Sequence, residues 1–199
     1  MITKLLLYCT KSKPYLLRED IDKDLVFIGT NKTDVVGNIL NGKIVAECDY
    51  EVEEIEYEYN WEGYENINYF TNKLTRKELE KQGCLTNEEL KNYLKLKPLC
   101  SVKGKIGYAI YIKELYIFDE PKELNEVYSI HNVGGMLLTD KLKKAPQNMQ
   151  RISVKEWEYG TYNPNDVAIL ISIHPEWLCK ILNGEKTIEI RKKVLKEML

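Results

Sequence analysis

The sequence predicts an α+β fold: a mixed β-barrel with a few short flanking helices. Many short segments are apolar or alternate between apolar and polar residues, as strands do, and only three carry helix signals. Strands that greatly outnumber helices argue against a parallel sheet with alternating helices. The 199 residues, 44% of them hydrophobic and 30% charged, suffice for one domain with a substantial core. We therefore expect a single domain over residues 1–199.

The first two predicted strands enclose a long loop. Ile2–Cys9 is an apolar run that ends at a polar, turn-forming segment, and Arg18–Leu40 is rich in Asp, Gly and Asn, as loops are. Asn41-Gly42 is a strong turn signal, and Lys43–Tyr59 after it reads as a long strand.

The long strand Lys43–Tyr59 changes its hydrophobic phase. Its apolar residues occupy even positions up to Val52 and odd positions from Ile55. A strand changes face only where a residue is inserted, so we expect a bulge or a break at Glu53-Glu54.

The segment from Glu47 to Glu65 contains nine acidic residues and no basic one. We interpret these acids as a solvated strand face and loop. An acidic ligand site is the alternative.

Capping signals place two short helices in the middle of the chain. Arg76–Gln82 follows Thr75 and ends near Gly83, which suits a helix C-terminus. Glu88–Leu94 opens with a capping box, Thr86 to Glu89. We expect the later elements to be strands at Lys105–Phe118, Arg151–Trp157 and Val167–Ile173, a helix at Glu176–Leu182 and an alternating segment at Thr187–Arg191.

Three segments are expected to interrupt these elements. Asp119-Glu120-Pro121 ends a strand, because proline cannot donate a ladder hydrogen bond. Val127–Lys144 contains Gly134-Gly135 and reads as irregular. Residues 159–166, with Pro164 and two asparagines, read as a linker between residues 1–158 and 167–199.

Composition limits the classes of function. The net charge is −2, which argues against tight, non-specific coating of nucleic acid but allows a local basic cleft. Five cysteines form no C-x-x-C pair, and two histidines add little to a metal cluster, so we expect reduced cysteines, no metal and no cofactor. No signal peptide and no apolar run near the roughly 18 residues of a membrane span are found. We expect a cytoplasmic protein without membrane contact.

The most informative segment lies near the C-terminus, at Ile171–Lys193. If Thr187–Arg191 is a strand, Glu189 and Arg191 share a face with Thr187, and a turning segment lets Lys186 reach the same cleft. Two cations beside a carboxylate suit recognition of a phosphate or a polarised carbonyl.

Two other interpretations of these charges remain open. A carboxylate and a lysine in a cleft shift each other's pKa and can perform acid–base chemistry. Alternatively, the segment is an exposed hairpin with Glu–Lys pairs of little energy. We expect Lys186 and Arg191 to project into solvent, so that their removal costs little stability.

The spacing of Gly184, Lys186, Glu189 and Arg191 is G-x-K-x-x-E-x-R, in a strand–helix–strand context. This segment resembles the opening of ASCH domains, relatives of PUA domains. LLLYCTKSKPYL at Leu5–Leu16 and later segments resemble those of phage and prophage ASCH proteins, so the resemblance covers most of the chain. It implies a PUA-like mixed β-barrel with a few short flanking helices.

The order of the segments differs from that family. There the G-x-K-x-x-E-x-R segment comes first and the YCTK-like strand follows, whereas here the opening lies at the end. A circular permutation within a monomer explains this, since the ends of compact domains often lie close together. A domain-swapped dimer, in which the motif serves a neighbouring chain, is the alternative. Permutation predicts that Val167–Ile173 pairs within its own chain.

The resemblance implies binding of RNA or a nucleotide. Lys11 and Lys13, in the turn after the first strand, would join Lys186 and Arg191 around an anionic ligand, with Thr187 nearby. Tyr8 or Trp177 would be available for stacking.

Two further functions stay open. Some ASCH proteins resemble amidohydrolases of acetylated cytidine, or ribonucleases; Lys186 and Glu189 would then be the catalytic pair. Glu189 departs from the amidohydrolase pattern, which has threonine at that position, and Thr187 is a weak substitute. A phage-type interaction or inhibitor protein, using the acidic strand Glu47–Glu58, is the third alternative.

Overall fold

The computed structural model describes residues 2, 4–10, 42–59, 67–94, 103–159 and 161–199. They form two compact units: unit 1 comprises Met1–Asp49 and Glu114–Asn183, and unit 2 comprises Tyr50–Lys113 and Gly184–Leu199. The predicted loop Arg18–Leu40 lies outside the described residues.

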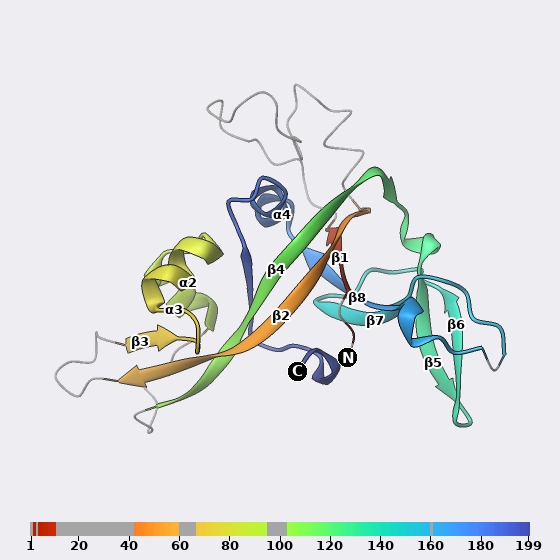
Figure 1. The fold of residues 1–199 in the computed structure, drawn as a ribbon, viewed down its shortest axis with the longest axis horizontal. Helices are drawn as coiled ribbons and strands as arrows, with labels where there is room; N and C mark the ends of the chain where they lie inside the picture. The colour runs from red at the N-terminus through yellow and green to blue at the C-terminus, as the bar shows by residue number, and fades with distance from the viewer. Residues whose placement is uncertain (1, 3, 11–41, 60–66, 95–102, 160) are drawn as a thin grey trace. The chain divides into compact units, whose positions relative to one another are not determined.

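Unit 1 is built on a sheet (Figure 1). The central strand of this sheet is almost wholly apolar. Its strands are β1 (Lys4–Cys9), β5 (Tyr128–Val133), β6 (Met136–Lys141), β7 (Met149–Ser153), β8 (Val167–Ile173) and the parts of β2 (Ile44–Tyr59) and β4 (Lys103–Lys122) that belong to it. All seven residues of β8 are buried, and β8 is a central strand, since β1 pairs with it in parallel on one side and β7 antiparallel on the other. The predicted pairing of Val167–Ile173 within its own chain is confirmed.

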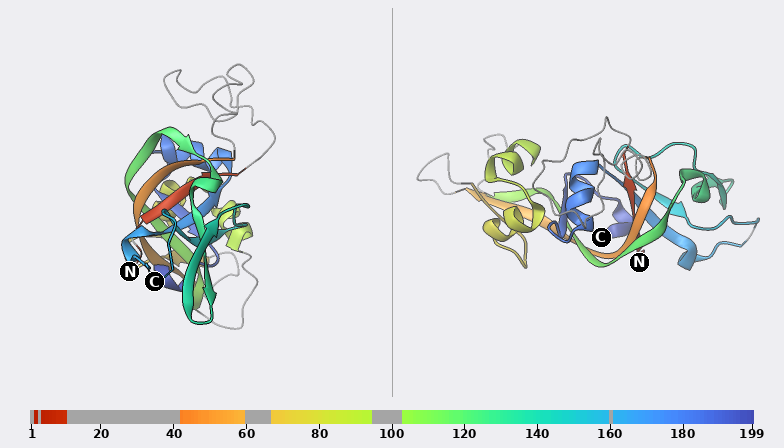
Figure 2. Two further views of the ribbon diagram at one scale, coloured as in Figure 1. Left: turned by 90° about the vertical axis from the view of Figure 1, so that its right-hand side faces the viewer. Right: turned by 90° about the horizontal axis from the view of Figure 1, so that it is seen from above.

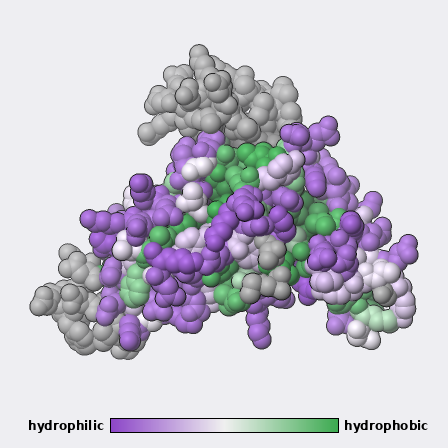
Figure 3. Space-filling view, viewed as in Figure 1, coloured by the Kyte–Doolittle hydropathy of each residue, from purple (hydrophilic) through white to green (hydrophobic). Residues whose placement is uncertain are grey.

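The expected irregular segment Val127–Lys144 is wrong: it contains the hairpin β5–β6 (Figure 2). Gly134 and Gly135 have φ of 61° and 87°, the left-handed values that a two-residue hairpin turn needs. Both strands expose many residues, so their apolar alternation was weak in the sequence. Figure 3 shows pale and hydrophobic atoms near the hairpin tip, where Val133 and Met136 are exposed.

Strand β4 is longer than predicted, since it continues through Asp119-Glu120-Pro121 to Lys122. The proline is tolerated because it lies one residue from the end of the strand. Strand β7 ends earlier than predicted, at Ser153, whose hydroxyl donates to the carbonyl of Lys155. In the predicted linker, Pro164–Asp166 forms a short 3-10 helix capped by the Asn163 side chain.

A break at Glu53-Glu54, one of the two predicted alternatives, is wrong, because β2 is continuous from Ile44 to Tyr59; the bulge stays a prediction. The change of phase is real: Cys48 is buried in unit 1, whereas Ile55 and Tyr57 are buried in the core of unit 2. The register irregularity described for β2 lies near its start, where Leu7 pairs with Ala46 and Tyr8 with Ile44. The first part of β2 therefore buries residues at even positions in unit 1, and the second part buries residues at odd positions in unit 2.

Unit 2 consists of β-strands and two helices. Its elements are the remaining parts of β2 and β4, β3 (Ile67–Phe70), β9 (Ile188–Arg191), α2 (Arg76–Gly83) and α3 (Asn87–Leu94). The predicted capping box of α3 is present, with Glu89 bonded to Thr86, and α2 has a second one that was not predicted, with Glu78 bonded to Thr75. Leu79 from α2 and Leu90 from α3 pack into the unit's hydrophobic core.

The prediction of an α+β fold is confirmed, with nine strands and three helices in the described residues, the third helix being α4 (Pro175–Leu182) in unit 1. The strand order is β6-β5-β7-β8-β1-β2-β4-β9, with β3 added to β2. Within the described residues this mostly antiparallel order has two ends and does not close into a barrel. None of the described helices is long and apolar enough to cross a membrane.

Candidate functional site

The predicted motif lies wholly in unit 2, on β9 and the turn before it. Ile188 and Ile190 point into the hydrophobic core, and the alternation of the strand places Glu189 and Arg191 on its other face, as predicted. In the pairing with β4, Glu189 is opposite Ile110 and Arg191 is opposite Tyr108.

Lys186 is buried, with only 3% of its surface exposed. Its Nζ donates a hydrogen bond to the carbonyl oxygen of Gly83 at 2.6 Å and lies 3.5 Å from Glu189 Oε2. The expectation that Lys186 projects into solvent is therefore wrong. The physical reason is the acceptor: carbonyls at a helix C-terminus lack partners within the helix, and an ammonium group satisfies one of them.

Glu189 joins the two cations of the motif. Its Oε1 lies 2.8 Å from Arg191 Nε, and its other oxygen faces Lys186. The Arg191 side chain is 14% exposed, so it too is less exposed than expected. These contacts form a continuous chain of polar groups, which we call the motif ion chain: the Gly83 carbonyl, Lys186, Glu189 and Arg191.

The C-terminus of α2 is docked against the motif. The backbone N–H of Thr187 donates to the Gln82 carbonyl at 3.0 Å, and a Cβ at Gly83 would approach Ile190 Cδ1 to 3.0 Å. Gly83 was predicted to cap the helix, but Cys84 has the left-handed conformation, with φ of 53°. The lack of a side chain at Gly83 lets the end of α2 lie close to β9, and the C-cap is the next residue, Cys84.

Burial lowers the pKa of Lys186, and the neighbouring Glu189 carboxylate opposes that shift. A buried lysine that loses its proton more readily than usual can act in acid–base chemistry. The Thr187 hydroxyl, by contrast, is engaged with Gln82 Oε1 at 3.3 Å. It is therefore a poor candidate for a nucleophile.

Two of the remaining predicted residues, Tyr8 and Trp177, belong to unit 1. Tyr8 is 3% exposed and packs in a hydrophobic core of unit 1, so its ring presents no open face. Trp177, on α4 of unit 1, lies under the ammonium group of Lys180, 4.7 Å from the ring centroid. Lys11 and Lys13 lie outside the described residues.

Two residues beside the motif were missed by the sequence analysis. Tyr93, near the end of α3, is 39% exposed, and Lys192 Nζ lies 5.2 Å from its ring centroid. The backbone of Lys192 also hydrogen-bonds the Tyr93 hydroxyl. No local signal connects Tyr93 with a motif about a hundred residues later; only the packing of α3 beside β9 does.

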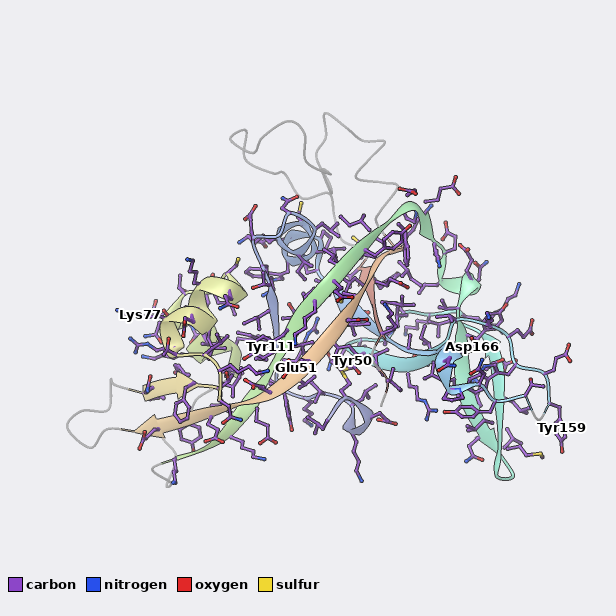
Figure 4. The ribbon with its side chains drawn as sticks, in the orientation of Figure 1. Tyr50, Glu51, Lys77, Tyr111, Tyr159 and Asp166 are labelled. Carbon is purple, nitrogen blue, oxygen red and sulfur yellow. The ribbon has the colours of Figure 1, made fainter. Side chains whose placement is uncertain are left out.

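Several acidic residues of strand β2 pair with lysines from elsewhere in the chain. In unit 2, Glu51 pairs with Lys73 and Lys113, and Lys105 pairs with Glu54. In Figure 4, Glu51 and Tyr111 lie on neighbouring strands. The expected solvated strand face therefore carries an ion-pair network around Glu51 and Glu54, while Glu56 and Glu58 further along the strand are exposed.

A tyrosine anchors this network at its buried side. Tyr111 Oη donates to Glu53 Oε2 at 2.8 Å and lies 3.0 Å from the Thr71 hydroxyl. Burial raises the pKa of Tyr111 to about 12, whereas Lys113 and Lys73 lower the pKa of Glu51 to about 2. At neutral pH the Tyr111 phenol therefore stays protonated and uncharged and the Glu51 carboxylate stays ionised, so neither exchanges a proton there.

In unit 1, Ser129, His131 and Asp140 have the composition of a catalytic triad but not its geometry. Ser129 Oγ is 2.8 Å from His131 Nε2, and Asp140 Oδ2 is 3.7 Å from the same nitrogen. In a triad the acid bonds the other ring nitrogen. Ser129 also donates its proton to the Asp140 carbonyl, so it is an acceptor toward His131 and is not activated. The group stabilises the β5–β6 hairpin.

The four cysteines in the described part of the chain, Cys9, Cys48, Cys84 and Cys179, are free thiols. Burial raises the pKa of both Cys9 and Cys48 to about 12, so neither is a ready nucleophile.

Comparisons of the chain with protein-family models, with curated proteins and with solved structures found no match. The interpretation of the site therefore depends on its own residues and geometry.

Proposed function

We propose that this chain is an ASCH-type, PUA-like domain that binds RNA or a nucleotide through the surface around Arg191. Lys186 and Glu189 position that arginine and do not contact the ligand. The observation that supports this assignment is the motif ion chain, which links the three charged motif residues to one helix end.

The division of roles follows from burial and contact. Lys186 is too buried to reach a ligand, and its bond to Gly83 holds it in place. Glu189 is held by Lys186 and lies against Nε of Arg191, which fixes the plane of the guanidinium group. An arginine with a fixed plane loses less entropy when it binds a phosphate, and its geometry matches phosphate oxygens.

Few cations support this surface. Lys192 and Lys193 follow Arg191 and are exposed, while the chain as a whole has a net charge of −2. A site with three or so cations releases about that many counterions, so affinity should fall only shallowly with salt.

The test is binding of fluorescent single-stranded RNA and of nucleotides to the parent and to Arg191→Ala. We expect the variant to bind about tenfold more weakly or worse, the loss typical of one charged hydrogen-bonded contact. Lys77→Ala is the matched control, because it removes one exposed positive charge from the other end of α2. Equal binding by the parent and Arg191→Ala across all ligands would refute the proposal.

Hydrolysis of a modified nucleoside or RNA is a second candidate, favoured by the lowered pKa of Lys186 beside Glu189. Glu189→Gln separates it from simple binding, because the amide keeps the shape and removes the proton acceptor. A hydrolase with acetylated cytidine or RNA as substrate should lose turnover by roughly 100-fold or more while retaining binding. A pure binding domain shows no turnover in the parent.

The third alternative, an interaction or inhibitor protein that uses the acidic strand, is weakened by the lysines paired with Glu51 and Glu54. It gains support only if the parent binds no nucleic acid or nucleotide.

A further inference from the structure

We propose that Tyr93 is a base-stacking residue of the Arg191 surface, so that the ligand is a single-stranded nucleic acid whose base lies on the exposed part of this ring while its phosphate contacts Arg191 and Lys192. This inference rests on the proposed function and extends it from an anion site to a site that reads a nucleobase.

The position of Tyr93 is set by contacts on two sides. Lys192 Nζ lies 5.2 Å from the ring centroid, and the Lys192 backbone hydrogen-bonds the hydroxyl. The next residue, Leu94, is buried in the core of unit 2 and anchors the end of α3. The ring is therefore fixed while 39% of the residue remains exposed.

The neighbouring charges belong to the motif. Burial raises the pKa of the Tyr93 hydroxyl, and the nearby charges of Arg191, which lowers it, and of Glu189, which raises it, have smaller effects. An exposed aromatic ring beside two consecutive cations, Arg191 and Lys192, is the combination with which proteins bind single strands: bases stack on the ring and phosphates contact the cations.

Stacking on Tyr93 predicts that the protein prefers strands with bases over strands without them, whereas a site that binds only phosphates has no such preference. A ring contributes affinity only for a ligand with a base, whereas Arg191 and Lys192 act on any phosphate chain. The parent should therefore bind short oligouridylate more tightly than an abasic strand of equal length, by about tenfold for one stacked base.

The experiment measures fluorescence anisotropy of labelled oligouridylate and of the labelled abasic strand with the parent, Tyr93→Leu, Tyr93→Phe and Arg191→Ala. We expect Tyr93→Leu to lose the preference for bases, Tyr93→Phe to keep it, and Arg191→Ala to weaken both probes. Phenylalanine is the matched control, because it preserves the ring and removes only the hydroxyl.

The outcomes separate the two proposals. If the parent prefers bases, Arg191→Ala weakens both probes and Tyr93→Leu still prefers bases, stacking on Tyr93 is refuted and the proposed function stands. Equal affinity of the parent for both probes refutes stacking even if Tyr93→Leu does not fold. Binding of neither probe by the parent refutes stacking on Tyr93, and the proposed function is refuted as well only if the parent also binds none of the other RNAs and nucleotides named above.

Discussion

Unit 2 contains two groups of lysines and glutamates with the same chemistry and different surroundings. The motif ion chain is buried, with Lys186 3% exposed and the Glu189 and Arg191 side chains 10% and 14% exposed. The ion pairs of Glu51 with Lys73 and Lys113 are on the surface, where the lysine side chains are about half exposed. Water screens the charges of the second group and hardly reaches those of the first. Removing one partner of an ion pair should therefore lower the free energy of unfolding much more in the motif ion chain than on the surface.

The largest difference is expected for Lys186→Met, which keeps the length of the side chain and removes its charge. Glu189 and the Gly83 carbonyl would lose a buried partner, and breaking a buried pair costs about 3–5 kcal/mol. We expect the free energy of unfolding, measured by urea denaturation, to fall by that amount. If Lys186→Met lowers the free energy of unfolding no more than the substitution of a surface lysine does, the burial of Lys186 does not contribute to stability. This replaces the expectation that removing Lys186 is harmless.

The stability lost in that variant should depend on pH. Burial lowers the pKa of Lys186, so between the lowered value and the ordinary 10.5 the unfolded chain binds more protons than the folded chain. Within that window this group makes the unfolding free energy rise with pH, and below it the cost of the buried charge is fully present. The gap in stability between the parent and Lys186→Met should therefore widen as pH rises toward 10.5. A gap that narrows would contradict the direction of the shift.

A smaller effect is expected at the buried side of the surface network. Tyr111→Phe removes a hydroxyl that bonds Glu53 and lies next to Thr71. The loss of a net hydrogen bond should lower the unfolding free energy by about 1 kcal/mol. Thermal denaturation at neutral pH measures it, with Tyr108→Phe as the control for a tyrosine on the same strand. No difference between the two variants would show that Glu53 and Thr71 find other partners.

The smallest effect is expected for Lys113→Ala, because Glu51 keeps Lys73 and both groups are solvated. We expect no measurable change in the melting temperature. The carboxyl of Glu51 should still respond: its pKa of about 2, set first by Lys113 and then by Lys73, should rise toward 4.5 in the variant. Titration followed by NMR at low salt measures this rise. An unchanged Glu51 titration would show that Lys113 does not contact it in solution.

Local patterns in the sequence were sufficient for several elements. The apolar run at Val167–Ile173 predicted β8, since a strand covered on both sides has no polar positions. Thr75 and the capping box from Thr86 to Glu89 placed the starts of α2 and α3, because the bonds at Thr75 and Thr86 are made within four residues. The spacing of Glu189 and Arg191 placed them on one face of β9.

Contacts between distant segments were decided only by the tertiary structure. Lys186 is buried because its acceptor, Gly83, approaches from 103 residues earlier, and no spacing around the motif reveals that. The acidic run in β2 looked uncompensated because Lys73, Lys105 and Lys113 come from other segments. Sequence periodicity reports which face of an element is apolar, whereas the partner of a charge depends on which elements pack together. The packing of elements therefore determines whether a lysine is exposed to solvent or, like Lys186, buried in an ion pair.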